Sequence, residues 1–131
     1  MKFIGGFALS LLAYFAIDAL LLTLAHGVSA PASSPFTGAS DPLELALDLG
    51  AQAMACLAAG LLALAPRGAT LKVATFGAGL PLFLITCVTT FAWWAHMPTW
   101  YNLTLLAVTW PFFILGAAWR ASARQVSRGV A

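Results

Sequence analysis

Four long apolar segments alternate with short polar stretches along the chain, at residues 3–25, 43–65, 71–95 and 99–119. Each segment is about 20 residues or slightly longer, which matches a hydrocarbon core of ~30 Å at 1.5 Å per residue. Backbone groups in lipid must satisfy their hydrogen bonds internally, so such segments form helices. The pattern predicts an all-α, integral membrane four-helix bundle that forms a single four-pass domain over residues 1–131.

The start of the second segment carries a helix-start signal, Asp41-Pro42-Leu43-Glu44. Asp41 is predicted as the N-cap, with Pro42 at the first helical position and Glu44 bonding back to the cap.

Proline interrupts the third and fourth segments near their middle. Pro81 and Pro111 lack a backbone N–H, and each frees the carbonyl four residues back, at Gly77 and Ala107. Two interpretations stay open: ordinary kinks, or paired broken helices that line a transport site. The halves of the chain show no inverted similarity that would support the second.

Composition strengthens the membrane assignment. Of the 131 residues, 62% are hydrophobic and 8% are charged, with a mean hydropathy of +0.94. A soluble domain carries about 25% charged residues, so the surface of this chain is expected to face lipid. The net charge of +2 is too small to indicate a nucleic-acid partner.

The basic residues predict how the chain is threaded. All six fall on one side of a four-pass topology: Lys2, Arg67, Lys72, Arg120, Arg124 and Arg128. The outer loop 26–40 and the connection at 96–98 contain no Lys or Arg. The positive-inside rule then places both termini in the cytoplasm, with 120–131 as a basic cytoplasmic tail, and favours a bacterial inner (cytoplasmic) membrane. The spacing of the three arginines would put them on one helix face, so a docking face for a cytoplasmic partner is the alternative to a plain basic tail.

The first segment also resembles a secretory signal, with Val28-Ser29-Ala30 as the cleavage site. Its apolar run is longer than a signal core of about 7–15 residues, which favours a retained helix.

Two acidic residues lie deep inside the apolar segments. Asp48 is roughly 10 Å inside the start of the second segment, and Asp18 is roughly 12 Å below the same surface. A charge near the middle of a bilayer costs at least about 2.5–3.5 kcal/mol, so both side chains are expected to turn inward and face each other. Three states stay open: neutral acids, acids hydrogen-bonded to polar neighbours, or acids that hold a cation or basic ligand.

Polar side chains gather in the outer half of every segment, at helical spacing on the first two. They are Ser10, Tyr14 and Asp18, then Glu44, Asp48 and Gln52, then Thr86, Thr89 and Thr90, and finally Tyr101, Asn102 and Thr104. The inner half is nearly bare of them, which predicts a pocket open to the outside and counts against a channel. The predicted ligand-binding residues are Asp18, Asp48, Gln52, Tyr14, Thr86, Thr90, Trp94, His96 and Asn102.

Aromatic residues crowd the end of the third segment, where Trp93, Trp94, Trp100 and Tyr101 occur within nine positions. They are typical of an interfacial belt, and the alternative is an aromatic cap that holds a cation over the pocket. His26 and His96 lie at the same interface, too shallow for a haem and without metal-ligand spacing, so no cofactor and no metal are predicted.

No nucleophile elbow, phosphate-binding loop or dinucleotide fingerprint occurs, so no catalytic residue is predicted and a non-enzymatic role is favoured. The first hypothesis is an accessory or assembly protein of the membrane, whose partners are lipids, further copies of the chain or a larger membrane complex. The second is a small ligand-binding or proton-coupled transport protein that uses Asp18 and Asp48 and takes a small amphiphilic or cationic ligand. An intramembrane enzyme acting on a lipid is a weaker third.

Overall fold

The computed structural model describes residues 2–26, 42–65 and 69–129, and within these ranges every regular element is a helix. The elements are α1 (Lys2–His26), α2 (Pro42–Ala63), α3 (Leu71–Ala74), the π-helical turn η1 (Thr75–Gly79), α4 (Leu80–Ala92), the 3₁₀ turn η2 (Trp94–His96) and α5 (Thr99–Gly129). The all-α prediction is therefore confirmed, with one helical rod for each apolar segment. The predicted cap, Asp41, lies outside the described residues, and α2 begins at Pro42 as expected.

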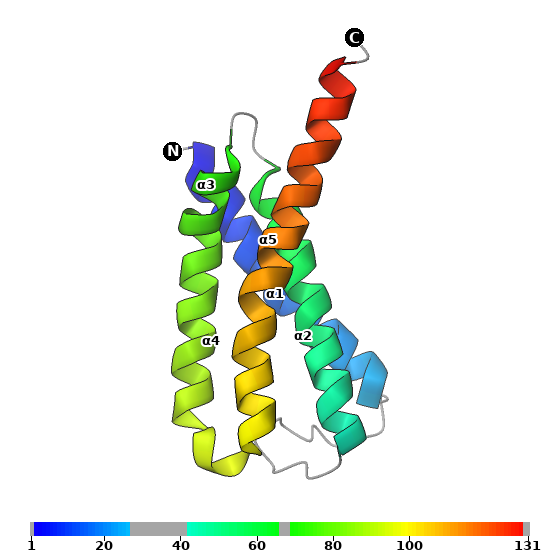
Figure 1. Ribbon diagram of the computed structural model, residues 1–131, viewed down its shortest axis with the longest axis vertical. Coiled ribbons are helices and arrows are strands. Elements are labelled where there is room, and N and C mark those ends of the chain that lie inside the picture. The colour runs from blue at the N-terminus through cyan, green and yellow to red at the C-terminus, as the bar shows by residue number, and fades with distance from the viewer. Residues whose placement is uncertain (1, 27–41, 66–68, 130–131) are drawn as a thin grey trace.

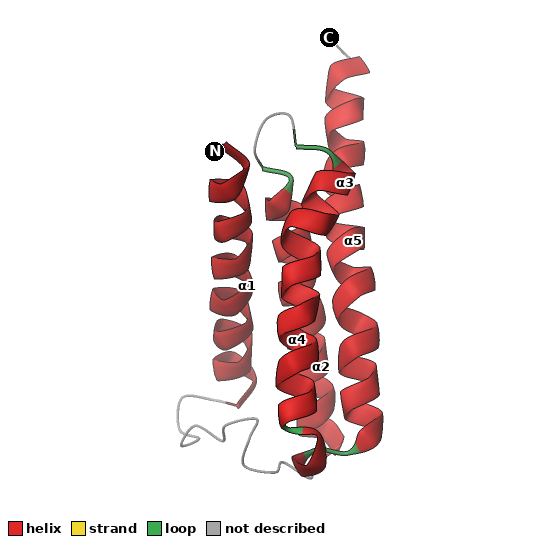
Figure 2. Cartoon of the chain, turned by 90° about the vertical axis from the view of Figure 1, so that its left-hand side faces the viewer, coloured by secondary structure: helices red, strands yellow, loops and turns green. Residues whose placement is uncertain are grey.

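The rods run alternately up and down (Figures 1 and 2). The start of α1 and the end of α5 lie at one end of the bundle, here called the proximal end. The turn η2, which joins α4 to α5, lies at the opposite, distal end, where α1 finishes and α2 starts. Among the described residues, the first turn of α1 and the last turn of α5 therefore lie at the same end of the bundle, although they are not side by side.

Three helical stretches are long and apolar enough to cross a membrane: Leu45–Ala63, Leu71–Ala92 and Thr99–Ser127. The described part of α1 holds a shorter apolar stretch, Gly6–Leu21. Large apolar side chains such as Leu12, Val88 and Leu103 are more than half exposed. Lipid solvates such a surface, whereas water does not, so these features indicate a membrane protein.

The centre of the bundle is the contact between α2 and α5, which are packed at very close range. Gly60 of α2 lies against the backbone of Phe113 and Ala117, and Gly116 of α5 lies against the carbonyl of Leu57. A Cβ atom at either glycine would come closer than 3.0 Å to backbone atoms of the other helix. Small residues let membrane helices approach in this way, since packing rather than water exclusion drives their association.

The third rod is not one uniform α-helix. Pro81 supplies no N–H to the helix, and the turn before it widens, so that the N–H of Leu80 donates to the carbonyl of Thr75, five residues back. Within this turn, Gly77 meets the ring of Phe7 from α1, and Gly79 meets the ring of Phe113 from α5. Pro111, in contrast, lies inside an α5 helix that continues without a break. The two prolines therefore do not form a matched pair of interruptions.

The last helix continues past the predicted end of the apolar segment at 119 and reaches Gly129. The guanidinium of Arg124 donates to the carbonyls of Leu64 and Ala65, the latter at 3.1 Å. These carbonyls follow the end of α2 and have no further turn of helix to bond to. Arg124 thus acts as a side-chain cap between two helices, while Arg120 is exposed.

Candidate functional site

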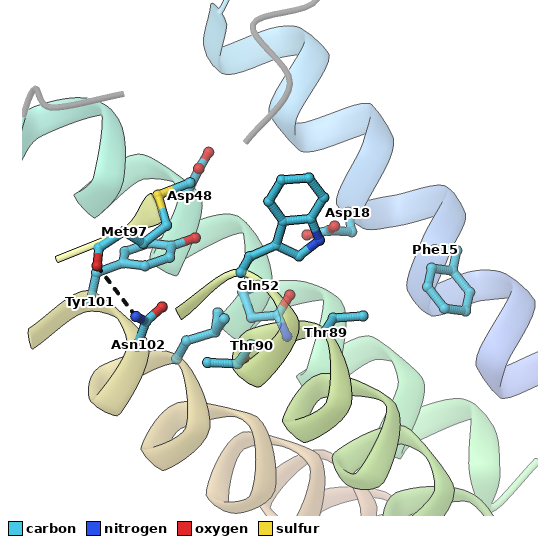
Figure 3. A pocket seen from close by; sticks show the side chains of 11 residues that line it. Phe15, Asp18, Asp48, Gln52, Thr89, Thr90, Met97, Tyr101 and Asn102 are labelled. Atoms are coloured by element: carbon cyan, nitrogen blue, oxygen red, sulfur yellow. Dashed lines mark hydrogen bonds between the residues drawn. The ribbon is translucent and has the colours of Figure 1, made fainter. Parts of the chain in front are cut away.

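A cavity of about 250 Å³ lies in the distal half of the bundle, and all four rods contribute to its wall (Figure 3). α1 provides Phe15 and Asp18, α2 provides Asp48 and Gln52, and α4 provides Thr89 and Thr90. The remaining lining residues are Trp93, Met97, Tyr101, Asn102 and Leu105, from the η2 connection and α5. The site is thus assembled from segments that are far apart in the sequence.

Two carboxylates from different helices line this one cavity. Asp48 is 9% exposed, and Asp18 on α1 is half-buried. No Lys, Arg or His side chain is among the lining residues. The described basic side chains of Lys72, Arg120 and Arg124 belong to segments at the proximal end (Figure 1). The cavity therefore concentrates acidic groups without a basic residue in its wall.

A buried polar relay fixes the inner wall of the cavity. The hydroxyl of Tyr14 donates to Oε1 of Gln52, and Nε2 of Gln52 donates to Oγ1 of Thr109 at 3.4 Å. Thr109 in turn donates to the carbonyl of Leu105 at 2.8 Å. This chain of bonds joins α1, α2 and α5 at one level, so the position of the Gln52 amide is determined by three helices.

The distal rim is tied down by Asn102, which is 2% exposed. Its Nδ2 donates to the carbonyl of Trp94 at 3.2 Å. It also donates to the carbonyl of Met97 at 3.4 Å, the bond drawn in Figure 3. These bonds attach the η2 turn to the first turn of α5. The side chain of Asn102 is consequently a structural part of the rim as well as a lining residue.

Thr90 contributes a hydroxyl group that is free to form a hydrogen bond. The residue is 4% exposed and lines the cavity. Its Oγ1 is buried and has no hydrogen-bond partner within the part of the chain that the structure describes. Buried hydroxyls are normally paired, so this atom is available to a molecule in the cavity.

The structure brings together five of the nine residues predicted for the ligand site in the wall of this cavity: Asp18, Asp48, Gln52, Thr90 and Asn102. The other four lie outside the lining. Tyr14 stands behind Gln52 as its hydrogen-bond donor, and the hydroxyl of Thr86 donates to its own helix at Leu82. Trp94 stacks on Phe91, and the exposed ring of His96 meets the edge of Trp93.

Six lining residues were not predicted as site residues: Phe15, Thr89, Trp93, Met97, Tyr101 and Leu105. Phe15 lies three residues from Asp18 and therefore on the same helix face, which is a signal that the sequence contains. Met97 and Leu105 are apolar, and polar periodicity cannot single out such residues in a chain that is apolar almost throughout.

Comparisons of the chain with protein-family models, with curated proteins and with solved structures found no match. Its function is therefore inferred from the site alone. Across the described residues, no three His, Cys, Asp or Glu side chains come together as metal ligands. Two carboxylates and the rings of Trp93 and Tyr101 line the cavity together, and both kinds of group attract cations.

Proposed function

We propose that this protein is an integral membrane protein that binds an ammonium-bearing ligand in its distal cavity. The observation that carries the proposal is that Asp18 and Asp48, from two helices, line one cavity whose wall contains no basic side chain. Ionised carboxyl groups within a bilayer are costly, and a ligand cation would stabilise the ionised form of both Asp18 and Asp48.

The aromatic residues in the wall support the same ligand chemistry. The faces of Trp and Tyr rings attract ammonium and quaternary ammonium groups, by about 2 kcal/mol or more where water is excluded. Trp93 and Tyr101 line the cavity, and Tyr101 is 7% exposed. Carboxylates combined with aromatic rings favour an organic cation, because its alkyl groups pack on the ring faces while its charge lies near the carboxylates.

Binding is expected to depend on the charge of both carboxylates. Choline should bind the wild-type protein in lipid nanodiscs, as measured by isothermal titration calorimetry, whereas its neutral analogue 3,3-dimethylbutanol should not. Asp18→Asn and Asp48→Asn should each weaken choline binding by at least about tenfold, because each removes one charge of the pair from the cation.

The matched control is Asp48→Glu, which retains the charge and should bind better than Asp48→Asn. If the neutral analogue binds as tightly as choline, or if both Asn variants bind choline like the wild type, a cation site is refuted. A membrane accessory protein without a ligand would then be the better description of the function.

The proposal includes an orientation: the proximal end lies in the cytoplasm and the cavity lies in the outer half of an inner membrane. It follows from the six basic residues, all on segments that the four-pass topology assigns to one side. Single cysteines at Ser33 and Ser122, in a background with Cys56→Ala and Cys87→Ala, should react with an impermeant thiol reagent from opposite sides of the membrane. Reaction of both from the same side would contradict this topology.

A further inference from the structure

The side chains on one side of the cavity wall are buried, and those on the other side are exposed. On the buried side of the wall, Gln52 is 7% exposed and Asn102 is 2% exposed. At the other side, Phe15 is 50% exposed, Trp93 is 38% exposed and Thr89 is also exposed. These three residues line the cavity and at the same time belong to the outer surface, so they mark its mouth. They come from α1 and from the end of α4.

The mouth lies between α1 and α4 because these helices are held apart from each other in the distal half. α1 packs against α2, and α4 packs against α5, whereas no extensive contact joins α1 to α4 among the described residues. α1 meets the third rod at the π-helical turn η1 near the proximal end, where Phe7 packs on Gly77. The opening therefore faces sideways, toward the region that lipid chains occupy in a membrane-spanning bundle.

The mouth is apolar although the interior is acidic. Phe15 and Trp93 present aromatic surface, and the hydroxyl of Thr89 is turned back onto its own helix, where it donates to the carbonyls of Ile85 and Thr86 at 3.0 Å. The cavity thus changes from apolar at the lipid-facing side to carboxylate and amide at the inner side.

Resting on the cation site proposed above, we propose that the ligand is a cationic single-chain amphiphile. Its ammonium head lies at Asp18 and Asp48, and its chain leaves between α1 and α4 into the lipid. The volume supports this division, since about 250 Å³ is less than the 300–1,000 Å³ of sites that enclose a drug-sized ligand. The head fits within the cavity, and the rest of an amphiphile must lie outside it.

Two features of the cavity restrict the chemistry of the head group. The buried hydroxyl of Thr90 adds a hydrogen bond for a head that carries an amine N–H or a neighbouring hydroxyl, a bond that a plain quaternary ammonium binds without. A phosphate beside the amine is disfavoured, because two carboxylates would repel it and the lining contains no Lys, Arg or His to offset the repulsion. Aminophospholipids are therefore poorer ligands than alkylamines or alkyl quaternary ammonium compounds.

The test compares a head group alone with the same head group on a chain. Tetramethylammonium and dodecyltrimethylammonium are titrated calorimetrically into the protein in nanodiscs, with empty nanodiscs subtracted. Thr89→Trp, at the mouth, should weaken binding of dodecyltrimethylammonium at least about tenfold more than it weakens binding of tetramethylammonium. Val88→Trp is the matched control, since Val88 is the adjacent exposed residue outside the lining, and it should change neither affinity.

A second measurement holds even if Thr89→Trp fails to fold. An alkylammonium probe with a photoreactive diazirine at the chain terminus should label residues of α1 and α4 beside the mouth in the wild type, and Asp48→Asn should abolish that labelling. Labelling of the lipid-facing Leu103 and Leu115 of α5 to the same extent would overturn the chain route, as would equal sensitivity of both probes to Thr89→Trp. Binding of tetramethylammonium under those outcomes would leave the cation site intact, whereas failure of both probes to bind the wild type would overturn both proposals.

Discussion

Alanine at Gly60 or Gly116 is expected to lower the free energy of unfolding by about 1–3 kcal/mol, even though each variant adds only a methyl group. The added Cβ at Gly60 would collide with the backbone of Phe113 and Ala117, and that at Gly116 with the carbonyl of Leu57. Backbone atoms cannot rotate away as side chains can. The helices α2 and α5 must therefore move apart, and fully buried residues at this contact, such as Ala117, lose their contacts.

The control for this prediction is Gly50→Ala, on the same helix as Gly60. A Cβ at Gly50 would meet nothing within 4 Å, so the substitution should leave stability unchanged or raise it slightly through helix propensity. Unfolding in mixed detergent micelles, followed by circular dichroism, measures all three variants. The double variant Gly60→Ala/Gly116→Ala should cost less than the sum of its parts, since one separation of the helices relieves both collisions. Unchanged stability of both single variants would show that α2 and α5 are not packed this closely.

Leucine at Gln52 is expected to destabilise the fold by about 1–3 kcal/mol, and adding Tyr14→Phe should restore part of that loss. Gln52 accepts the hydrogen bond of the Tyr14 hydroxyl, and Tyr14 is 6% exposed. Leucine fills a similar space but leaves that hydroxyl buried and unbonded, which carries its full desolvation cost. Phenylalanine at position 14 removes the orphaned group, so the double variant should be more stable than Gln52→Leu alone.

The same micelle unfolding experiment tests the relay, with Gln125→Leu on the exposed face of α5 as the control, expected within about 0.5 kcal/mol of the wild type. Additive losses for Tyr14→Phe and Gln52→Leu would mean that the two residues are not coupled, contrary to the bond between them.

Sequence and structure agree best on the helices. Apolar runs of membrane-spanning length predicted four helical rods, and the start of α2 at Pro42 followed from its local signal. The third rod shows the limit of such reasoning. Pro81 marks an interruption in the sequence, but the π-helical turn before it is packed against the rings of Phe7 and Phe113 through Gly77 and Gly79. The two rings come from other helices, so the proline in the sequence does not reveal these contacts.

The fourth rod shows a second feature that the sequence did not predict. The sequence loses its apolar character at 119, whereas α5 continues to Gly129 because a helix needs only satisfied hydrogen bonds and can leave the lipid. Arg124 was predicted as part of a basic tail, and its contact with the carbonyls of Leu64 and Ala65 depends on α2 ending beside it. A basic residue in the sequence does not reveal which helix end it will reach.

For the site, the sequence by itself predicted how far along their helices Asp18 and Asp48 lie. Only the tertiary structure decided which residues surround them. A helical rise of 1.5 Å per residue predicts similar depths for Asp18 and Asp48, and the cost of exposing a carboxylate to lipid predicts that both turn inward. In the structure both residues line one cavity. Which residues close the cavity and which leave it open depends on how the rods are arranged around one another. Phe15, Thr89 and Trp93 form the mouth only because α1 packs on α2 and α4 packs on α5. In a chain that is apolar on nearly every face, hydrophobic pattern cannot specify which apolar face meets a helix and which meets lipid, and close contacts such as those of Gly60 and Gly116 make that choice.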